Sequence, residues 1–286
     1  MAQKGLFPIG RERHGTRFWH RFTSYDFARP LTEVPVVAAE IRQAASAFPV
    51  AFRAVDTGVR PVAVLSLMSG QDTPFVSARG RWLAPYVPAA LRCHPFYARS
   101  TGTQGQMAVL VDETSGLITD DPRDEPFFLP DGTASAGLAA VVTFLQNREA
   151  AAQEMASICA TLDAMALFTP LASHEGVDLP EGMLGIDVDR LGALPDAHIV
   201  LLMRAGALGL FHAHQLSLQH CHWLAQAGLQ KATPPTDTTP PGNESLDDFL
   251  CALAQAHEND AVPGMLGEES TCLQATSLPL KRGLRP

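Results

Sequence analysis

The pattern of apolar and polar positions between residues 34 and 66 predicts the order strand, helix, strand, strand. The segment "VPVVA" (34–38) is rich in β-branched residues, which favour strands. Ile41, Ala45 and Phe48 then recur at the spacing of one helix face. After this helix, "PVAFRAV" and "RPVAVLSLM" indicate two strands joined by a turn at Asp56–Gly58.

Prolines set the pattern of the next stretch, "TPFVSARGRWLAPYVPAALRCHPF" (73–96). Pro85, Pro88 and Pro95 exclude a continuous helix or a central strand, because proline fixes φ and lacks an N–H. We therefore expect a short strand, a turn at Gly80 and a short helix over Pro88–Cys93.

Residues 107–135 combine a predicted hairpin with an acidic loop. "MAVLVDETSGLIT" (107–119) alternates like a hairpin, with its turn at Thr114–Gly116. "DDPRDEPFFLPDGTAS" (120–135) is acidic and contains prolines, but its spacing is not that of a calcium-binding EF-hand loop. We interpret this second stretch as a solvated loop.

The second half of the chain is predominantly helical in pattern. Ser135 precedes an Ala-rich run to about Met165, which predicts one helix of about 30 residues or two helices broken near 148–152. Short extended pieces follow, and two or more helices then occupy 190–227. Gly206 and Gly209 indicate a joint or a close contact between these helices.

These elements predict an α+β fold, in which a twisted, mostly antiparallel sheet is covered by helices. The sheet would come from 34–120 and 165–190, and the helices from 137–165 and 190–227. We divide the chain into an N-terminal arm (1–24), an α+β domain (25–230) and a flexible, disordered acidic tail (231–286). The tail contains a linker-like "TPPTDTTPPGNE" and one amphipathic helix at 244–258.

Charge narrows the classes of function. The chain has a net charge of -9, which opposes general binding to nucleic acid because phosphates are neutralised by Lys and Arg. The basic, aromatic segment 1–24 could serve as a nucleic-acid arm, but packing on the acidic body is the favoured interpretation. The five cysteines include no CxxC pair, which indicates reduced thiols.

Neither a membrane span nor a secretory signal is evident in the sequence. The best apolar stretch, "HIVLLMRAGALGLFHA", is interrupted by Arg204, whereas a spanning helix needs about 20 apolar residues. The N-terminal residues lack the apolar core of a signal peptide. We therefore expect a cytoplasmic protein, with export by a route that needs no signal left open.

The sequence contains no GxSxG, Walker, HExxH or strand-associated GxGxxG motif. Cys93 and His94 are adjacent, so their side chains would diverge on a helix or strand. These observations favour a binding protein over an enzyme, and they predict no cofactor.

The stretch "FHAHQLSLQHCH" (211–222) concentrates potential metal ligands. The weak candidates are His212, His214, His220, Cys221 and His222. On one helix no two of the histidines are three or four residues apart, which is the spacing needed to share an ion. Apolar residues lie on several sides of this helix, so we predict a buried helix with core histidines and no metal site.

Four ordered segments resemble the bacterial SapC family, whose members are associated with surface layers. They are "YDFA" (25–28), "VPVVAAEIRQAASAFPVAF" (34–52), "FVSARGRWLAPYVPAALRCHPF" (75–96) and "GIDVDRLGALPDAHIVLLMRAGALGLFHAHQLSL" (185–218). The resemblance covers about residues 14–228. The His–Cys–His at 220–222 lies outside these shared blocks.

This resemblance implies a bacterial accessory or binding protein linked to surface-layer or envelope assembly, with a surface-layer or envelope protein as its partner. The helix at 244–258 would dock that partner or fold back on its own domain. The alternative is a cytoplasmic enzyme or small-molecule sensor with a pocket between sheet and helices. We predict that its ligand-binding residues would be Trp82, Tyr86, Arg92 and His214.

Overall fold

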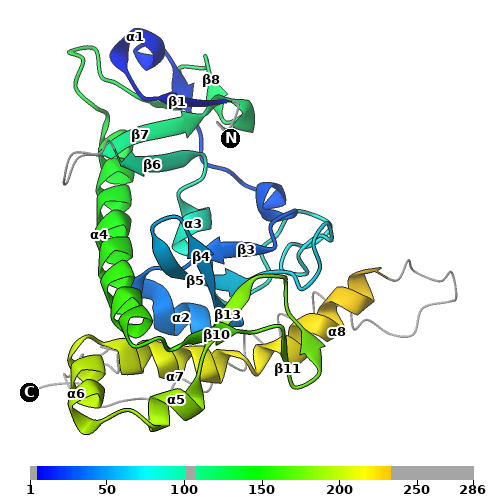
Figure 1. Cartoon of the computed structure of the whole chain (residues 1–286). Helices are drawn as coiled ribbons and strands as arrows, with labels where there is room; N and C mark the ends of the chain where they lie inside the picture. The colour runs from blue at the N-terminus through cyan, green and yellow to red at the C-terminus, as the bar shows by residue number, and fades with distance from the viewer. Residues whose placement is uncertain (1–4, 101–106, 233–286) are drawn as a thin grey trace, which may run out of the picture.

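The longest element is α4 (Ala136–Ala164), and the other elements are arranged along it (Figure 1). The computed structural model describes residues 5–100 and 107–232, so the predicted tail helix at 244–258 lies outside the described residues. For the run after Ser135, the sequence left open one long helix or two broken ones, and the structure confirms a single helix, α4. It contains no proline, and its only glycine is Gly137 in the first turn, so helix-forming residues continue without interruption.

A five-stranded antiparallel sheet lies beside the C-terminal half of α4 (Figure 1). Its strands, in spatial order, are β10 (Phe168–Pro170), β13 (Met183–Ile186), β4 (Val50–Val55), β5 (Gly58–Val64) and β3 (Glu33–Pro35). Between β3 and β4 the chain forms η2 (Ala38–Glu40) and α2 (Ile41–Ala45). The predicted order of strand, helix, strand, strand is confirmed, and so is the α+β class.

Two smaller antiparallel sheets lie at the other end of α4. One has the order β1 (Leu6–Pro8), β7 (Met107–Asp112), β6 (Phe96–Ser100), and the other β8 (Ile118–Thr119), β2 (Phe18–Trp19), β9 (Glu125–Pro126). The segment predicted as an N-terminal arm therefore supplies β1 and β2. Trp19 is only 5% exposed, so its ring is packed down on the body of the protein.

The prediction of a hairpin over 107–119 is wrong, although the turn it contained is present as η3 (Glu113–Ser115) and Gly116. β7 pairs with β6 on one edge and with β1 on the other. Both edges are thus occupied, and the chain after the turn pairs with β2 instead.

Short helices complete the described part of the chain. They are α1 (Arg11–His14), η1 (Asp26–Ala28), α3 (Ala89–Arg92), α5 (Val188–Gly192), α6 (Asp196–Arg204), α7 (Ala207–Ser217) and α8 (His220–Ala232). β11 (Ser173–His174) pairs with β12 (Val177–Asp178). The predicted turn at Gly80 is confirmed by its φ of +75°, and the short helix after Pro88 is confirmed as α3.

The joint at Gly206 is also confirmed. This residue has a φ of +77°, and α6 and α7 meet there at an angle of 85°. Among residues 5–100 and 107–232, no individual helix has both the length and the apolar character to cross a membrane, and only this bent pair reaches that composition when taken together.

Buried side chains form three apolar clusters, and α4 contributes to two of them. Leu138 and Leu145, near its beginning, pack with Trp19 and Phe96 from the small sheets. Met155, Cys159 and Leu162, near its end, pack with residues of β4 and α7. The third cluster fills the space around the five-stranded sheet and α8. The helix therefore connects two separately packed regions.

We expect Ser135→Ala to lower the free energy of unfolding by about 1 kcal/mol, the usual contribution of such an N-cap. Ser135 is 1% exposed, and its Oγ accepts a hydrogen bond from the Leu138 backbone N–H at 3.1 Å. Urea denaturation measures the difference. Ser157→Ala, at an exposed position within α4, is the control and should leave stability unchanged or slightly higher. Equal effects of the two changes would contradict the capping role.

Candidate functional site

Glu40 buries its carboxylate, with 3% of the residue exposed. Its Oε1 accepts a hydrogen bond from the Val37 backbone N–H at 3.2 Å. Its Oε2 accepts two more at 2.7 Å, from the Ala89 backbone N–H and from the Tyr86 hydroxyl. Burial of a carboxylate is costly unless it is hydrogen-bonded, so these donors hold segment 37–40 against segment 86–89.

Arg92, the last residue of α3, extends this network to the surface. Its guanidinium donates to the Tyr86 hydroxyl at 3.1 Å and lies 3.9 Å from Glu40 Oε2. It also lies 5.4 Å from the centre of the Phe144 ring on α4. The Trp82 indole N–H supports Tyr86 by donating to its carbonyl at 2.8 Å. Burial, reinforced by Glu40, raises the pKa of Tyr86 to about 12, so its hydroxyl stays protonated at neutral pH.

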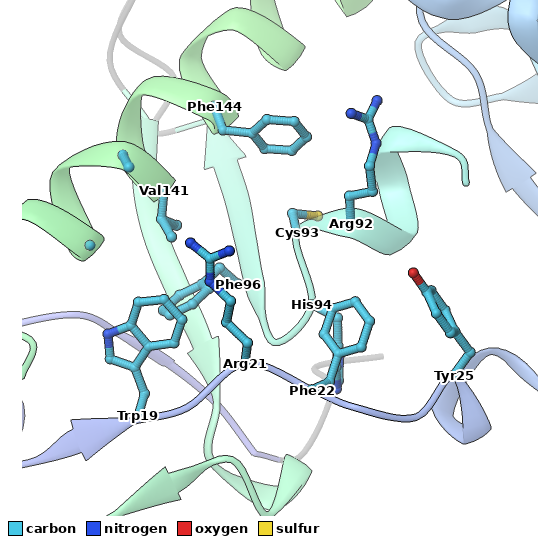
Figure 2. Close-up of a pocket in the computed structure, with 12 residues that line it drawn as sticks. Trp19, Arg21, Phe22, Tyr25, Arg92, Cys93, His94, Phe96, Val141 and Phe144 are labelled. Carbon is cyan, nitrogen blue, oxygen red and sulfur yellow. The ribbon is translucent and has the colours of Figure 1, made fainter. Parts of the chain in front are cut away.

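A hollow of about 410 Å³ lies beside Arg92, between α4, the start of β6 and the segment after β2. We call it the Arg92 hollow. Its lining residues are Trp19, Arg21, Phe22, Tyr25, Arg92, Cys93, His94, Phe96, Gly137, Ala140, Val141 and Phe144. Figure 2 shows the Arg21 side chain extending toward Val141 on α4, beside the Trp19 ring, and the Arg92 side chain pointing away from Arg21, beside Phe144.

A second hollow, of about 310 Å³, adjoins the first. Arg92 and Phe144 line both, so these two side chains separate the hollows. Glu40, Tyr86 and Arg148 belong to the second one. The Nε of Arg148 is buried without a hydrogen-bond partner among the described residues. Each hollow therefore contains an arginine besides Arg92: Arg21 in the Arg92 hollow and Arg148 in the second one.

Cys93 and His94 do not form a catalytic pair. The Cys93 thiol donates to the Ala90 carbonyl at 3.3 Å, and burial raises its pKa. The His94 ring stacks on Phe27 with 3.9 Å between ring centres, and burial lowers the pKa of the imidazole. The pair therefore supplies a protonated thiol and a neutral ring, whereas cysteine nucleophiles act as thiolates.

The structure brings Trp82, Tyr86 and Arg92 together, but it places His214 elsewhere. His214 is 1% exposed and lies between α7 and the five-stranded sheet. Its Nδ1 is 2.6 Å from the Val50 carbonyl, and its Nε2 accepts from the Ile186 N–H at 3.4 Å. Because a carbonyl can only accept, the proton is on Nδ1. His214 thus links β4 and β13 as a neutral core residue.

The candidate metal ligands do not converge. The helix breaks after Ser217, so the stretch belongs to α7 and α8, but His214 and Cys221 are buried while His212 and His222 are exposed. No group of three or more potential ligands occurs within residues 5–100 and 107–232. The prediction of a helix buried on most sides is wrong, since Leu216 is 66% exposed. The face of α7 that carries Leu210 and His214 packs on the body of the protein, whereas Leu216 is directed outward.

The sequence interpretation missed three residues of the site: Glu40, Arg21 and Phe144. Glu40 occurs in a helix-like segment, where glutamate is usually solvated. The available signal was its place inside an otherwise apolar block that precedes a strand. Arg21 and Phe144 are far apart in sequence, and only the folded chain brings both to Arg92.

Within its described residues, the chain is an α+β domain with an aromatic, cationic hollow and no nucleophile–base pair at it. The SapC family model matches residues 9–224, and the chain belongs to the SapC family. No curated protein and no solved structure matches it.

We expect Glu40→Gln to lower the free energy of unfolding by about 2–3 kcal/mol. The amide nitrogen cannot accept, so at least one of the three buried donors loses its partner. Guanidinium denaturation measures the change. The matched control is Glu154→Gln, an exposed position on α4, which should stay within about 0.5 kcal/mol of the wild type. A Glu40→Gln variant as stable as this control would show that the network does not hold the two segments.

Burial lowers the pKa of His214, so this residue makes stability depend on pH. The unfolded histidine takes up a proton below about pH 6.5, whereas the folded one resists protonation, because a proton on Nε2 would face the Ile186 N–H. Stability is therefore present above pH 6.5 and is lost as the pH falls toward the folded pKa. Between pH 7.5 and 5.5 the loss from this residue should be about 1 kcal/mol.

His214→Gln keeps a donor and an acceptor but does not titrate, so urea unfolding at the two pH values should show a smaller loss than in the wild type. His14 and His94 also have lowered pKa values, so part of the pH dependence should remain. His198→Gln, at an exposed position, should keep the full loss. An unchanged pH dependence in His214→Gln would contradict the assigned tautomer and its role.

Proposed function

We propose that this protein is a non-enzymatic accessory of surface-layer or envelope assembly and that it binds its ligand at the Arg92 hollow. The observation that carries the proposal is the composition of this hollow. It combines two arginines with aromatic walls, while the adjacent cysteine is protonated and the histidine neutral. Such a site can hold and orient a ligand without a group that would attack it.

Membership of the SapC family supplies the link to surface layers, through the association of that family with them. The partner in this proposal is a surface-layer or envelope protein. The segment 244–258, with its predicted apolar face, would be a second point of attachment. The net charge of -9 argues against nucleic acid as a partner.

A small-molecule sensor is the second candidate. The hollow lies between a strand and a helix, and its volume of about 410 Å³ falls in the range of small-ligand pockets, about 300–1,000 Å³. Both candidates use the same residues, and they differ in whether the ligand is part of a larger envelope component.

We expect the full chain, used as bait in a lysate of the bacterium that encodes it, to recover a surface-layer, envelope or secretion protein. Arg21→Gln should reduce recovery, because it removes a charge from the hollow without breaking a hydrogen bond or ion pair among the described residues. Arg42→Gln removes an exposed arginine on α2 and should recover as much as the wild type. Quantitative mass spectrometry of the three eluates measures the difference.

A deletion strain provides the second measurement, and it should display less surface-layer protein than its parent. Recovery of no envelope component, together with parental levels of surface protein, would overturn the accessory function. A specific shift in melting temperature with a metabolite, in that situation, would favour the sensor.

A further inference from the structure

The Arg92 hollow is cationic within an acidic protein. Its lining includes Arg21 and Arg92 but no aspartate or glutamate. Arg21 is exposed and forms no hydrogen bond or ion pair with the residues that the structure describes. Glu40, which lines the second hollow, lies 3.9 Å from Arg92 and offsets part of the charge of Arg92. Glu125, which lies outside this lining, accepts from the Gly137 N–H at 3.1 Å. The charge of Arg21 therefore remains available to a ligand.

Most of the N–H donors of Arg92 have no acceptor among the described residues. A guanidinium has five N–H donors in a planar fork, and Arg92 uses one of them on the Tyr86 hydroxyl. The same planar fork is the group that pairs best with a carboxylate, through two parallel hydrogen bonds. Both arginines line the hollow from different segments, and Figure 2 shows the Arg21 guanidinium near Trp19 and that of Arg92 beside Phe144.

Flat apolar surfaces surround these charges. Trp19 and Phe96 form the wall on one side, Phe144 projects from α4, and Phe22 lies opposite. Trp19 packs edge-on against Phe96 with 4.8 Å between ring centres, so the position of this wall is fixed by the core. Aromatic walls of this kind favour ligands that carry a planar ring.

We propose that the Arg92 hollow binds a small aromatic carboxylate, with the carboxylate on Arg21 and the ring between the aromatic walls, while Arg92 adds positive charge to the lining. The inference rests on the proposed binding function and specifies its ligand class. The carboxylate replaces the acidic partner that Arg21 lacks within the described residues. The neighbouring Cys93 and His94 add no charge, so selectivity for an anion comes from the two arginines.

A series of three indoles tests the charge requirement on the full chain by isothermal titration calorimetry at pH 7.5. Indole-3-acetate carries a negative charge, indole-3-acetamide is neutral and tryptamine is positive, while the ring is the same. Indole-3-acetate should bind at least about tenfold more tightly than the amide, because a hydrogen bond to a charged group contributes about 1.5–3 kcal/mol. Tryptamine and plain acetate should bind more weakly than both.

Variants separate the arginine from the ring. Arg21→Gln should weaken indole-3-acetate about tenfold and leave the affinity for indole-3-acetamide unchanged, whereas Arg42→Gln should change neither. Equal affinity for the acetate and the amide, preference for tryptamine, or an Arg21→Gln variant with wild-type affinity would each overturn the proposal. Absence of binding heat for every indole, each titrated at 10-fold the concentration used for the plain acetate control, would also overturn the proposal.

The two proposals fail in different experiments. If the lysate bait recovers an envelope protein but no indole binds selectively, the accessory function stands and the aromatic carboxylate is excluded. If indole-3-acetate binds as described but neither the bait nor the deletion strain shows an envelope effect, the ligand class stands and the accessory function is excluded.

Discussion

The buried carboxylate of Glu40 is the interaction on which the position of the site depends. It binds donors from its own turn and from a segment 46–49 residues later in the chain. Since the buried acceptor and its donors would each lose a partner on separation, the two segments stay together. α3 begins at one of these donors and ends at Arg92, so the carboxylate sets the place of the guanidinium and of β6 behind it.

Local patterns predicted the elements of the fold, but not all of their pairings. The long helix after Ser135, the strands on either side of Gly58 and the short helix after Pro88 each depend on adjacent residues, and the structure confirms them. β7 pairs with β1, which lies about a hundred residues earlier. No periodicity within 107–119 contains that information, because the choice between partners depends on which edges the rest of the chain already occupies.

The candidate site was predictable only where its residues are close together in the sequence. Trp82, Tyr86 and Arg92 belong to one continuous block, and the structure brings them together. His214 belongs to another block and satisfies both of its ring nitrogens inside the core. A histidine in an apolar helix is compatible with a binding role or with a core role, and only the location of its backbone partners distinguishes the two.

The Arg92 hollow occupies the boundary between two of the three apolar clusters. On one side are the rings grouped around Trp19 and Phe96, and on the other the cluster that Tyr25 and Tyr86 flank. Complete apolar packing at such a boundary would bury Arg92 and leave its charge unpaired, which is costly. Arg92 instead remains 45% exposed in its side chain while Glu40 is held in the interior. The geometry that stabilises the boundary therefore also keeps a cation accessible there, so the candidate site follows from how the two clusters are joined.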